Sequence, residues 1–212
     1  MKRSLTVALL LLTGLSFGQN KKYMDAMEKN VAALDTTYKP DQFQPLANNF
    51  ERIAGAEKAE WLPNYYAAYC NVNMSYNVKG DMIDTYCDKA DHYLHIADSL
   101  NPNNSEIYTL MAQVASARIS VNPMTRGQKY GTMSAELRDK AKELDKTNPR
   151  PYYLDGTSYF YTPPMFGGGK DKAKPMFQKA EELFGTFKPA SSIAPRWGKA
   201  SNEYFLKQCD GK

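Results

Sequence analysis

The residues best suited to hold a metal ion are His92 and His95, the only histidines of the chain. They lie three apart on one expected helix, and Asp88 lies one turn earlier, so zinc could be offered two imidazoles and a carboxylate. The same helix has a buried stripe that includes Leu94 and Ala97, which turns both histidines towards solvent or a neighbouring unit. An exposed pair without a third strong ligand is typical of a polar face, and we expect no metal site.

A glycine run at 167–169, followed by Lys170, resembles part of a phosphate-binding loop. Such a loop needs a glycine, four residues and then Gly-Lys-Ser/Thr between a strand and a helix. Here Asp171 takes the Ser/Thr position, and a helix is expected before the loop. We interpret the glycines as a flexible turn into a helix that begins at Asp171, with anion binding at that helix start as the lesser alternative.

No arrangement typical of nucleophilic catalysis is found in the sequence. Both histidines share one helix, and no Gly-x-Ser-x-Gly elbow occurs. Paired carboxylates such as Glu181 and Glu182 fall on a helix face with lysines nearby, as on a solvated surface. We therefore expect a protein that is not an enzyme and that uses no cofactor.

Fifteen tyrosines are the most unusual feature of the composition. They crowd two expected helices, around residues 65–76 and 152–161, and tyrosine combines contact area with a hydroxyl group. The main hypothesis is a scaffold that binds a protein or peptide partner through a concave, tyrosine-rich face. The alternative is a carrier of a small ligand or metal in the same groove. About half of the rings are expected to fill space between helices instead.

Two expected turns, at 122–130 and 162–170, are longer than the other turns of the chain. Insertions in repeat proteins tend to gather on one face, often the binding face, although these two could equally cover an edge of the stack. Together with the tyrosine-rich helices they supply the candidate binding residues, namely Tyr65, Tyr69, Asn71, Gln113, Arg126, Lys129, Tyr153, Phe166 and Lys170.

The elements that must position these residues are helices, because helical periodicity dominates and no alternating strand pattern appears. Asn-Pro and Gly steps punctuate the pattern, and similar helix pairs recur at intervals of 42 and 44 residues. This spacing predicts an all-α fold, an α-solenoid of antiparallel helix pairs. We expect a single domain over 19–212, with pairs at 21–57, 61–100, 104–146 and 150–186 and a C-terminal helix at 195–208.

The second helices of the pairs resemble the tetratricopeptide repeat. That family carries alanine, a large apolar residue four positions later and alanine three later, as in Ala90, Leu94 and Ala97. Small residues let two helix axes approach closely while the bulky residue fills the gap between turns. The motif recurs later in the chain, and small residues also occupy the matching first-helix positions: Ala173, Phe177, Ala180, Ala112, Gly156 and, more loosely, Cys70.

The resemblance covers roughly residues 60–185 and has departures. The units are longer than the family's usual repeat of about 34 residues. Ser134 and Arg138 stand where alanine and a bulky apolar residue are expected. The whole chain is also similar to short, signal-bearing tetratricopeptide-like proteins of the Bacteroidota, in stretches such as 122–127 and 165–170. The resemblance implies a scaffold.

The first residues have the pattern of a secretory signal peptide. Lys2 and Arg3 precede an uncharged, mostly apolar run from Leu5 to Phe17, and we expect cleavage after Gly18. The run is shorter than the roughly 20 apolar residues of a spanning helix. The sequence thus predicts a signal peptide at 1–18, no transmembrane segment after its removal, and a periplasmic or secreted protein.

The charge of the chain is close to balanced. Its formal net charge of +4 falls to +2 without residues 1–18, which argues against a nucleic-acid partner. Residues 19–125 are acidic and 126–212 basic, which suggests either steering of a charged partner or ordinary solvated faces. Cys70 and Cys87 could face each other across a hairpin and form a disulfide, but we slightly favour two buried thiols.

Overall fold

The structure, a computed structural model, describes residues 21–37 and 39–211. The proposed signal peptide lies outside these residues. The described chain is helical, with a first helix at 21–34, and it contains no strand. The helices that follow are α2 (Pro40–Ala56), α3 (Trp61–Ser75), α4 (Asp81–Leu100), α5 (Ser105–Ile119), α6 (Pro123–Leu144), α7 (Arg150–Tyr161), the 3-10 helix η1 (Pro164–Phe166), α8 (Lys170–Thr186) and α9 (Lys199–Cys209).

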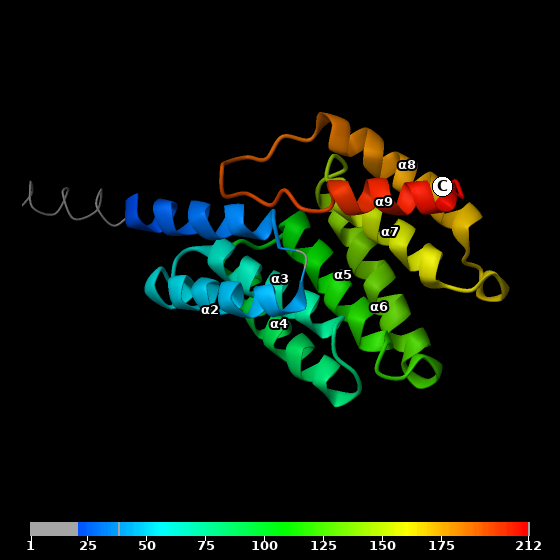
Figure 1. The fold of residues 1–212 in the computed structure, drawn as a ribbon, viewed down its shortest axis with the longest axis horizontal. Coiled ribbons are helices and arrows are strands. Elements are labelled where there is room, and N and C mark those ends of the chain that lie inside the picture. Colours follow the sequence, from blue (N-terminus) through cyan, green and yellow to red (C-terminus); the bar gives the residue numbers. More distant parts are fainter. Residues whose placement is uncertain (1–20, 38, 212) are drawn as a thin grey trace, which may run out of the picture.

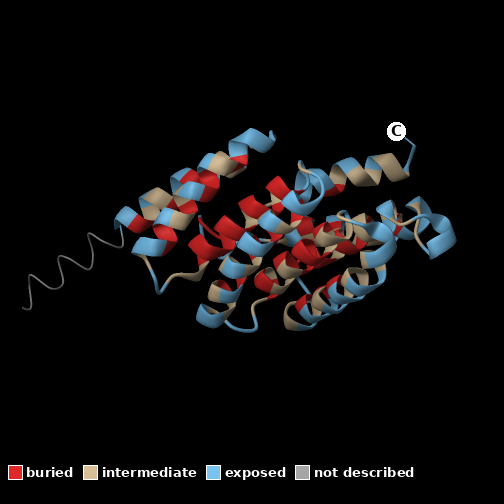
Figure 2. Ribbon diagram, turned by 90° about the horizontal axis from the view of Figure 1, so that it is seen from below, coloured by how far each residue is buried: buried red, intermediate tan, exposed pale blue. Residues whose placement is uncertain are grey.

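Consecutive helices pack on one another in pairs, which confirms the predicted all-α solenoid (Figure 1). The first helices of successive pairs, α3, α5 and α7, also contact one another in order and form one layer of the stack. Buried residues gather on the faces between neighbouring helices, whereas the outer turns are exposed (Figure 2). The layer formed by α3, α5 and α7 therefore provides a continuous wall along the molecule.

The small residues of the repeat pattern lie where helices meet. Ala90, Leu94 and Ala97 are fully buried on α4. A side chain added at Gly156 would overlap the ring of Phe177, so glycine is what allows α7 and α8 to pack this closely. The motif thus has the physical role that its pattern suggested.

The helix pair α5 and α6 departs from the repeat pattern. It has a polar contact at the position where the pattern has an apolar one. Arg138 is 6% exposed and donates to Asp155 on α7 at 2.6 Å and to the hydroxyl of Ser134 at 2.6 Å. Ser134 in turn donates to the carbonyl of Ala112 at 2.8 Å. Because each buried polar group here has a partner, α5, α6 and α7 remain closely packed without the usual alanine and bulky apolar residue.

One predicted loop is wrong. The stretch 122–130 was expected to be an enlarged turn, but α6 already begins at Pro123. The side chain of Asn122 accepts a hydrogen bond from the backbone N–H of Thr125 at 3.2 Å, which caps the helix. Proline at the first helical position is pre-organised for a helix and loses no hydrogen bond there, so the step starts α6 rather than interrupting it. The other enlarged turn, which contains η1, lies outside the α-helices as expected.

No helix in the described part of the chain is both long and apolar enough to cross a membrane.

Candidate functional site

Two grooves lie on the wall formed by the first helices. The N-terminal groove has a volume of about 580 Å³, and the central groove one of about 590 Å³. Both borders include Asn73 and Tyr76 from the end of α3, so the two grooves are neighbours. Together they provide two adjoining hollows beside the end of α3.

The central groove lies over α3, α5, α7 and α9. It combines aromatic rings with hydroxyl and amide groups, and none of its lining side chains is charged. Tyr161 is 71% exposed and forms an open rim, whereas Phe205 of α9 packs deeper, with its ring stacked on that of Phe177 at 5.5 Å. Besides the two shared residues, the groove is characterised by Gln113, Ser116, Tyr153, Thr157, Tyr161 and Phe205.

The N-terminal groove lies between the helix at 21–34, α2, α3 and the start of α9. Its apolar wall includes Leu34, Phe43 and Trp197. Its polar border carries the cations Arg196 and Lys199 and the carboxylates Asp35 and Glu203. Arg196 forms an ion pair with Asp35 at 2.7 Å. Lys199 is exposed and has no ion-pair partner among the described residues. This groove therefore differs from the central one by having charged groups of both signs at its edge.

Trp197 stands between the two grooves. Its ring contacts Tyr69, which lines the N-terminal groove, at 5.3 Å, and Tyr153, which lines the central groove, at 6.4 Å. The indole N–H donates to the hydroxyl of Tyr65 at 2.7 Å. The ring thus lines the N-terminal groove and packs against a residue that lines the central one.

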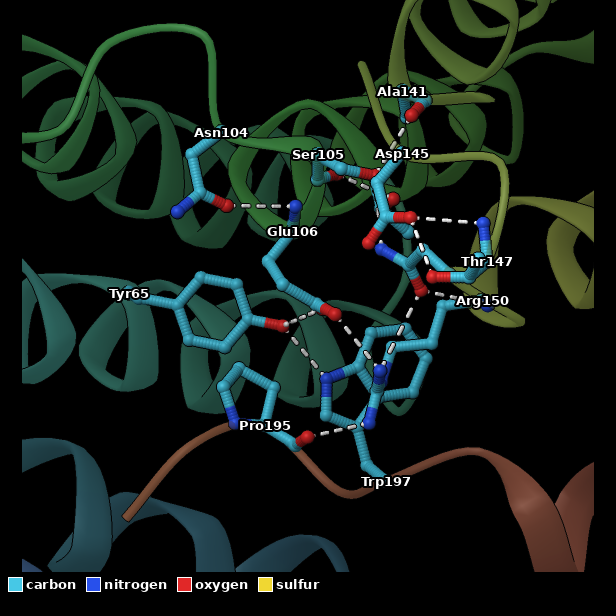
Figure 3. Close-up of polar contacts among 12 residues, drawn as sticks. Tyr65, Asn104, Ser105, Glu106, Ala141, Asp145, Thr147, Arg150, Pro195 and Trp197 are labelled. Carbon is cyan, nitrogen blue, oxygen red and sulfur yellow. Dashed lines mark hydrogen bonds and ion pairs between the residues drawn. The ribbon is translucent and has the colours of Figure 1, made fainter. Parts of the chain in front are cut away.

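A buried polar network holds Trp197 in place (Figure 3). Arg150 of α7 is fully buried and donates to Glu106 of α5 at 2.8 Å and to the carbonyl of Pro195 at 2.6 Å. The hydroxyl of Tyr65 donates to the same glutamate at 3.4 Å. The guanidinium group also lies over the ring of Trp197 at 5.4 Å, so α3, α5 and α7 jointly fix the segment before α9.

That segment, residues 187–198, is not helical, and it crosses from the end of α8 to the helix at 21–34 (Figure 1). Tyr66 donates to the carbonyl of Ile193 at 2.8 Å, and Ser192 donates to Glu28 at 2.6 Å. These contacts join residues more than a hundred positions apart in the chain. They bring Trp197 and α9 to the wall of first helices, and the C-terminal helix thereby becomes part of the site.

Three of the candidate residues line the grooves: Tyr69 the N-terminal one, Gln113 and Tyr153 the central one. Tyr65 and Asn71 are buried behind the wall, and Asn71 donates to the carbonyl of Ala67 in its own helix at 2.8 Å. Tyr65 belongs instead to the network that holds Trp197.

The other candidates lie outside both grooves. Arg126 forms an ion pair with Asp84 at 2.8 Å, and Lys129 lies over the ring of Tyr130 at 5.0 Å. Phe166 is 71% exposed on η1. Lys170 donates to the carbonyl of Gln208 at 2.6 Å and thus joins the start of α8 to the end of α9.

Trp197 and Phe205 were not among the predicted binding residues. The signal that could have identified them is modest: Trp197 is one of two tryptophans in the chain, and aromatic residues of this size dominate binding surfaces. Their placement depends on contacts with Arg150 and Tyr66, which sequence spacing does not reveal.

The possible zinc ligands His92, His95 and Asp88, from which no metal site was expected, all lie exposed on α4. Asp88 is paired with Arg118 at 2.7 Å. Within residues 21–37 and 39–211, no group of three or more His, Cys, Asp or Glu side chains is arranged to hold a metal ion. The grooves themselves are lined by no histidine, cysteine or methionine from the described chain.

Comparison with known proteins identifies one informative relative. No family model and no curated protein matches the chain, so the resemblance to the tetratricopeptide repeat stays a prediction. Among solved structures, the HusA haemophore from Porphyromonas gingivalis is similar, with 38% sequence identity and a TM-score of 0.81. The match covers 89% of this chain and 93% of that one.

This similarity corrects the main functional hypothesis. A scaffold for a protein or peptide partner was expected, but the relative is a haemophore, a protein that binds a small ligand. The finding favours the alternative, a carrier with its ligand in the groove. The expectation that the chain is not an enzyme agrees with a relative that is a binding protein.

Proposed function

We propose a function from one premise: this chain belongs to the family of the HusA haemophore. The proposal is that the chain binds haem as a cargo, without covalent attachment and without turnover. The observation that carries it is the match to a haemophore over 89% of this chain, at 38% sequence identity. The signal-like N-terminus supports an exported, periplasmic or extracellular carrier.

The central groove suits the flat, largely apolar ring of haem. Its volume of about 590 Å³ lies within the range of about 300–1,000 Å³ that is usual for ligand sites. Tyr153, Tyr161 and Phe205 line the groove with aromatic rings, and each ring stacked on the macrocycle contributes about 0.5–1.5 kcal/mol beyond the burial of area. Affinity in this proposal comes from stacking and from the removal of apolar surface from water.

The two carboxylates of haem lie on one edge of its ring and need water or cations. We assign that edge to the side of the N-terminal groove, where Lys199 has no ion-pair partner among the described residues and Arg196 is paired with Asp35. The shared residues Asn73 and Tyr76 connect this side to the central groove. The uncharged central groove would then receive the apolar part of the macrocycle, in agreement with the cost of burying a carboxylate away from charge.

The experiment is a titration of the purified protein with haem, followed by the shift of the Soret band. We expect saturable binding at a defined stoichiometry. Tyr161→Ala removes a mostly exposed wall of the central groove and should weaken binding by about three- to tenfold. The matched control is Tyr204→Ala, because Tyr204 is 59% exposed on α9 and lines neither groove. Absence of saturable binding by the unaltered protein would refute the proposal.

A further inference from the structure

One end of the solenoid exposes a set of large apolar side chains, which we call the terminal patch (Figure 1). It covers the end of α7, the turn that contains η1 and the second half of α9, and its members are Tyr159, Tyr161, Met165, Phe166 and Tyr204. The rings of Tyr161 and Tyr204 both contact that of Phe205, at 5.9 and 5.4 Å, so α7 and α9 meet here. We propose that the terminal patch docks the protein on an anionic lipid surface, with Met165 and Phe166 inserted among the lipids.

Met165 and Phe166 form the tip of the patch. They are neighbours in η1, and they are 81% and 71% exposed. Clustered apolar side chains on a protein surface mark sites that contact other proteins or membranes. Because these two lie in the turn between α7 and α8, they can enter a lipid layer while the helices stay outside it.

The backbone of this turn is suited to leaving water. Pro163 and Pro164 have no N–H group to satisfy. The four successive N–H groups of residues 166–169 all donate within the turn, at 2.8 to 3.2 Å, to the carbonyls of Tyr159, Pro163 and Pro164. An N–H group without a partner is costly in lipid, so a turn that pairs its own N–H groups enters at a lower cost.

The turn also has a fixed shape before it meets any surface. Gly167 and Gly169 have φ values of +85° and +102°, which glycine adopts without strain. A side chain at Gly168 would overlap the backbone carbonyl of Thr162, so the chain passes closely there. The glycine run at 167–169 thereby positions the tip, and binding does not have to order a flexible loop.

Lysines surround the terminal patch. Lys170 and Lys172 are exposed in the first turn of α8. Lys207 is exposed on α9, three residues after Tyr204 and therefore on the same side of that helix. Neither Lys172 nor Lys207 has an ion-pair partner among the described residues. Their positive charges are therefore available to an anionic surface.

Carboxylates at this end are fewer than lysines. They are Asp171 and Asp210, and Asp210 is paired with Lys174 at 2.9 Å. Glu203 of α9 borders the N-terminal groove instead. Four lysines against two aspartates leave this end with a net positive charge, which attracts anionic headgroups.

The order of side chains matches the interface between lipid and water. Methionine and phenylalanine occupy the tip, tyrosines lie at the end of α7 and on α9, and lysines lie around them. In membrane proteins, tyrosine is enriched at the level of the headgroups, and lysine keeps its charge in water while its stem covers apolar surface. Charge and polarity together favour a lipid surface as the occupant.

The test measures co-sedimentation of the protein with lipid vesicles. Residues 1–18 are left out, because the apolar run at 5–17 would bind lipid by itself. Vesicles of equal parts phosphatidylglycerol and phosphatidylcholine are compared with vesicles of phosphatidylcholine alone. We expect saturable binding to the anionic vesicles and binding at least about tenfold weaker to the neutral ones, because each lysine near the surface contributes about fivefold.

Two double variants separate insertion from charge attraction. Met165→Ser with Phe166→Ser should weaken binding to the anionic vesicles by about tenfold or more, because it removes the apolar tip. Lys172→Gln with Lys207→Gln should weaken it by about tenfold and make it less dependent on salt. All four side chains are exposed, so the fold should stay intact, and circular dichroism checks this.

Matched controls make the same chemical changes away from the terminal patch. Leu100→Ser removes an exposed apolar side chain at the end of α4. Lys58→Gln with Lys188→Gln removes two exposed positive charges, one before α3 and one after α8. Both controls should bind the anionic vesicles almost as tightly as the unaltered protein.

Insertion of the tip has a readout of its own. Met165→Cys in a Cys209→Ser background places one reactive thiol at the tip, because Cys70 and Cys87 are buried. A polarity-sensitive dye on that thiol should brighten and shift to the blue when anionic vesicles are added. An unchanged dye spectrum would contradict insertion and overturn the inference.

Absence of binding to the anionic vesicles would also overturn it, as would binding that neither double variant weakens. If the protein without lipid instead formed a dimer that the serine variant dissociated, the terminal patch would be an interface between two copies of the chain, which overturns the inference too. No haem is present in these measurements, so their outcome is separate from that of the proposed function.

Discussion

Arg150 on α7 and Glu106 on α5 form an ion pair at 2.8 Å in which the arginine side chain is fully buried. The same guanidinium group donates to the carbonyl of Pro195 and lies over the ring of Trp197. The pair therefore does more than join two helices of the stack. It connects the wall of first helices to the segment that carries Trp197 to the grooves (Figure 3).

Removal of this arginine should destabilise the fold strongly. Arg150→Met leaves Glu106 buried without its cationic partner, a change that costs about 3–5 kcal/mol in comparable cases. Urea denaturation measures the loss in the free energy of unfolding. Arg196→Met is the control, because its ion pair with Asp35 is largely exposed and should be worth no more than about 1 kcal/mol. Similar losses in both variants would show that burial of the first pair has no special effect.

The stability of the fold should depend on the protonation of Glu106. Burial raises the pKa of this carboxyl group, an effect that outweighs the opposing influence of Arg150 and of the Tyr65 hydroxyl. The folded state then binds the proton more tightly than the unfolded state does. The resulting stabilisation is fully present below the pKa of an unfolded glutamate and is lost as the pH rises through the raised value.

The measurement is the free energy of unfolding from about pH 4 to pH 8, in the unaltered protein and in Glu106→Gln. The difference between the two proteins isolates the contribution of this group from that of other titrating residues. We expect the unaltered protein to lose stability relative to the variant as the pH rises. A relative gain would mean that the arginine outweighs burial and lowers the pKa.

The contact between α7 and α8 should tolerate no side chain at Gly156. A methyl group there would overlap the ring of Phe177, and overpacking of this kind costs about 1–3 kcal/mol. Gly156→Ala should therefore lower the midpoint of thermal unfolding. Gly185→Ala in α8 is the matched control, because no atom lies near the added carbon, and alanine favours the helix by up to about 1 kcal/mol. Equal effects at both glycines would contradict the close approach.

The reactivity of the three cysteines should follow their burial. Cys70 and Cys87 are buried free thiols, and burial raises the pKa of Cys87 to about 11 and that of Cys70 as well. Cys209 is partly exposed. A thiol reagent should therefore modify Cys209 in the native protein, and all three thiols after denaturation. Cys209→Ser should abolish native labelling, whereas absence of two thiols in the denatured, unreduced protein would indicate a disulfide between Cys70 and Cys87.

The repeat pattern predicts the architecture well because it depends on local chemistry. Helical periodicity, Asn-Pro steps and small residues such as Ala90 and Gly156 act within one helix pair, and each describes a contact with the next helix in the chain. The wrong loop at 122–130 has an equally local cause. The Asn-Pro step there starts a helix instead of ending one, and only the cap formed by Asn122 distinguishes the two outcomes.

The sequence by itself determined the helices, their pairing into a solenoid and the enrichment of its first helices in tyrosine and amide side chains. Only the tertiary structure decided which of these side chains meet. The hydroxyl of Tyr65 belongs to a buried hydrogen-bonded network. Gln113 and Tyr153 line the central groove together with Phe205, which lies near the C-terminal end of the chain. The physical reason is that the grooves are closed by long-range contacts, such as that between Arg150 and Pro195, which no local period encodes.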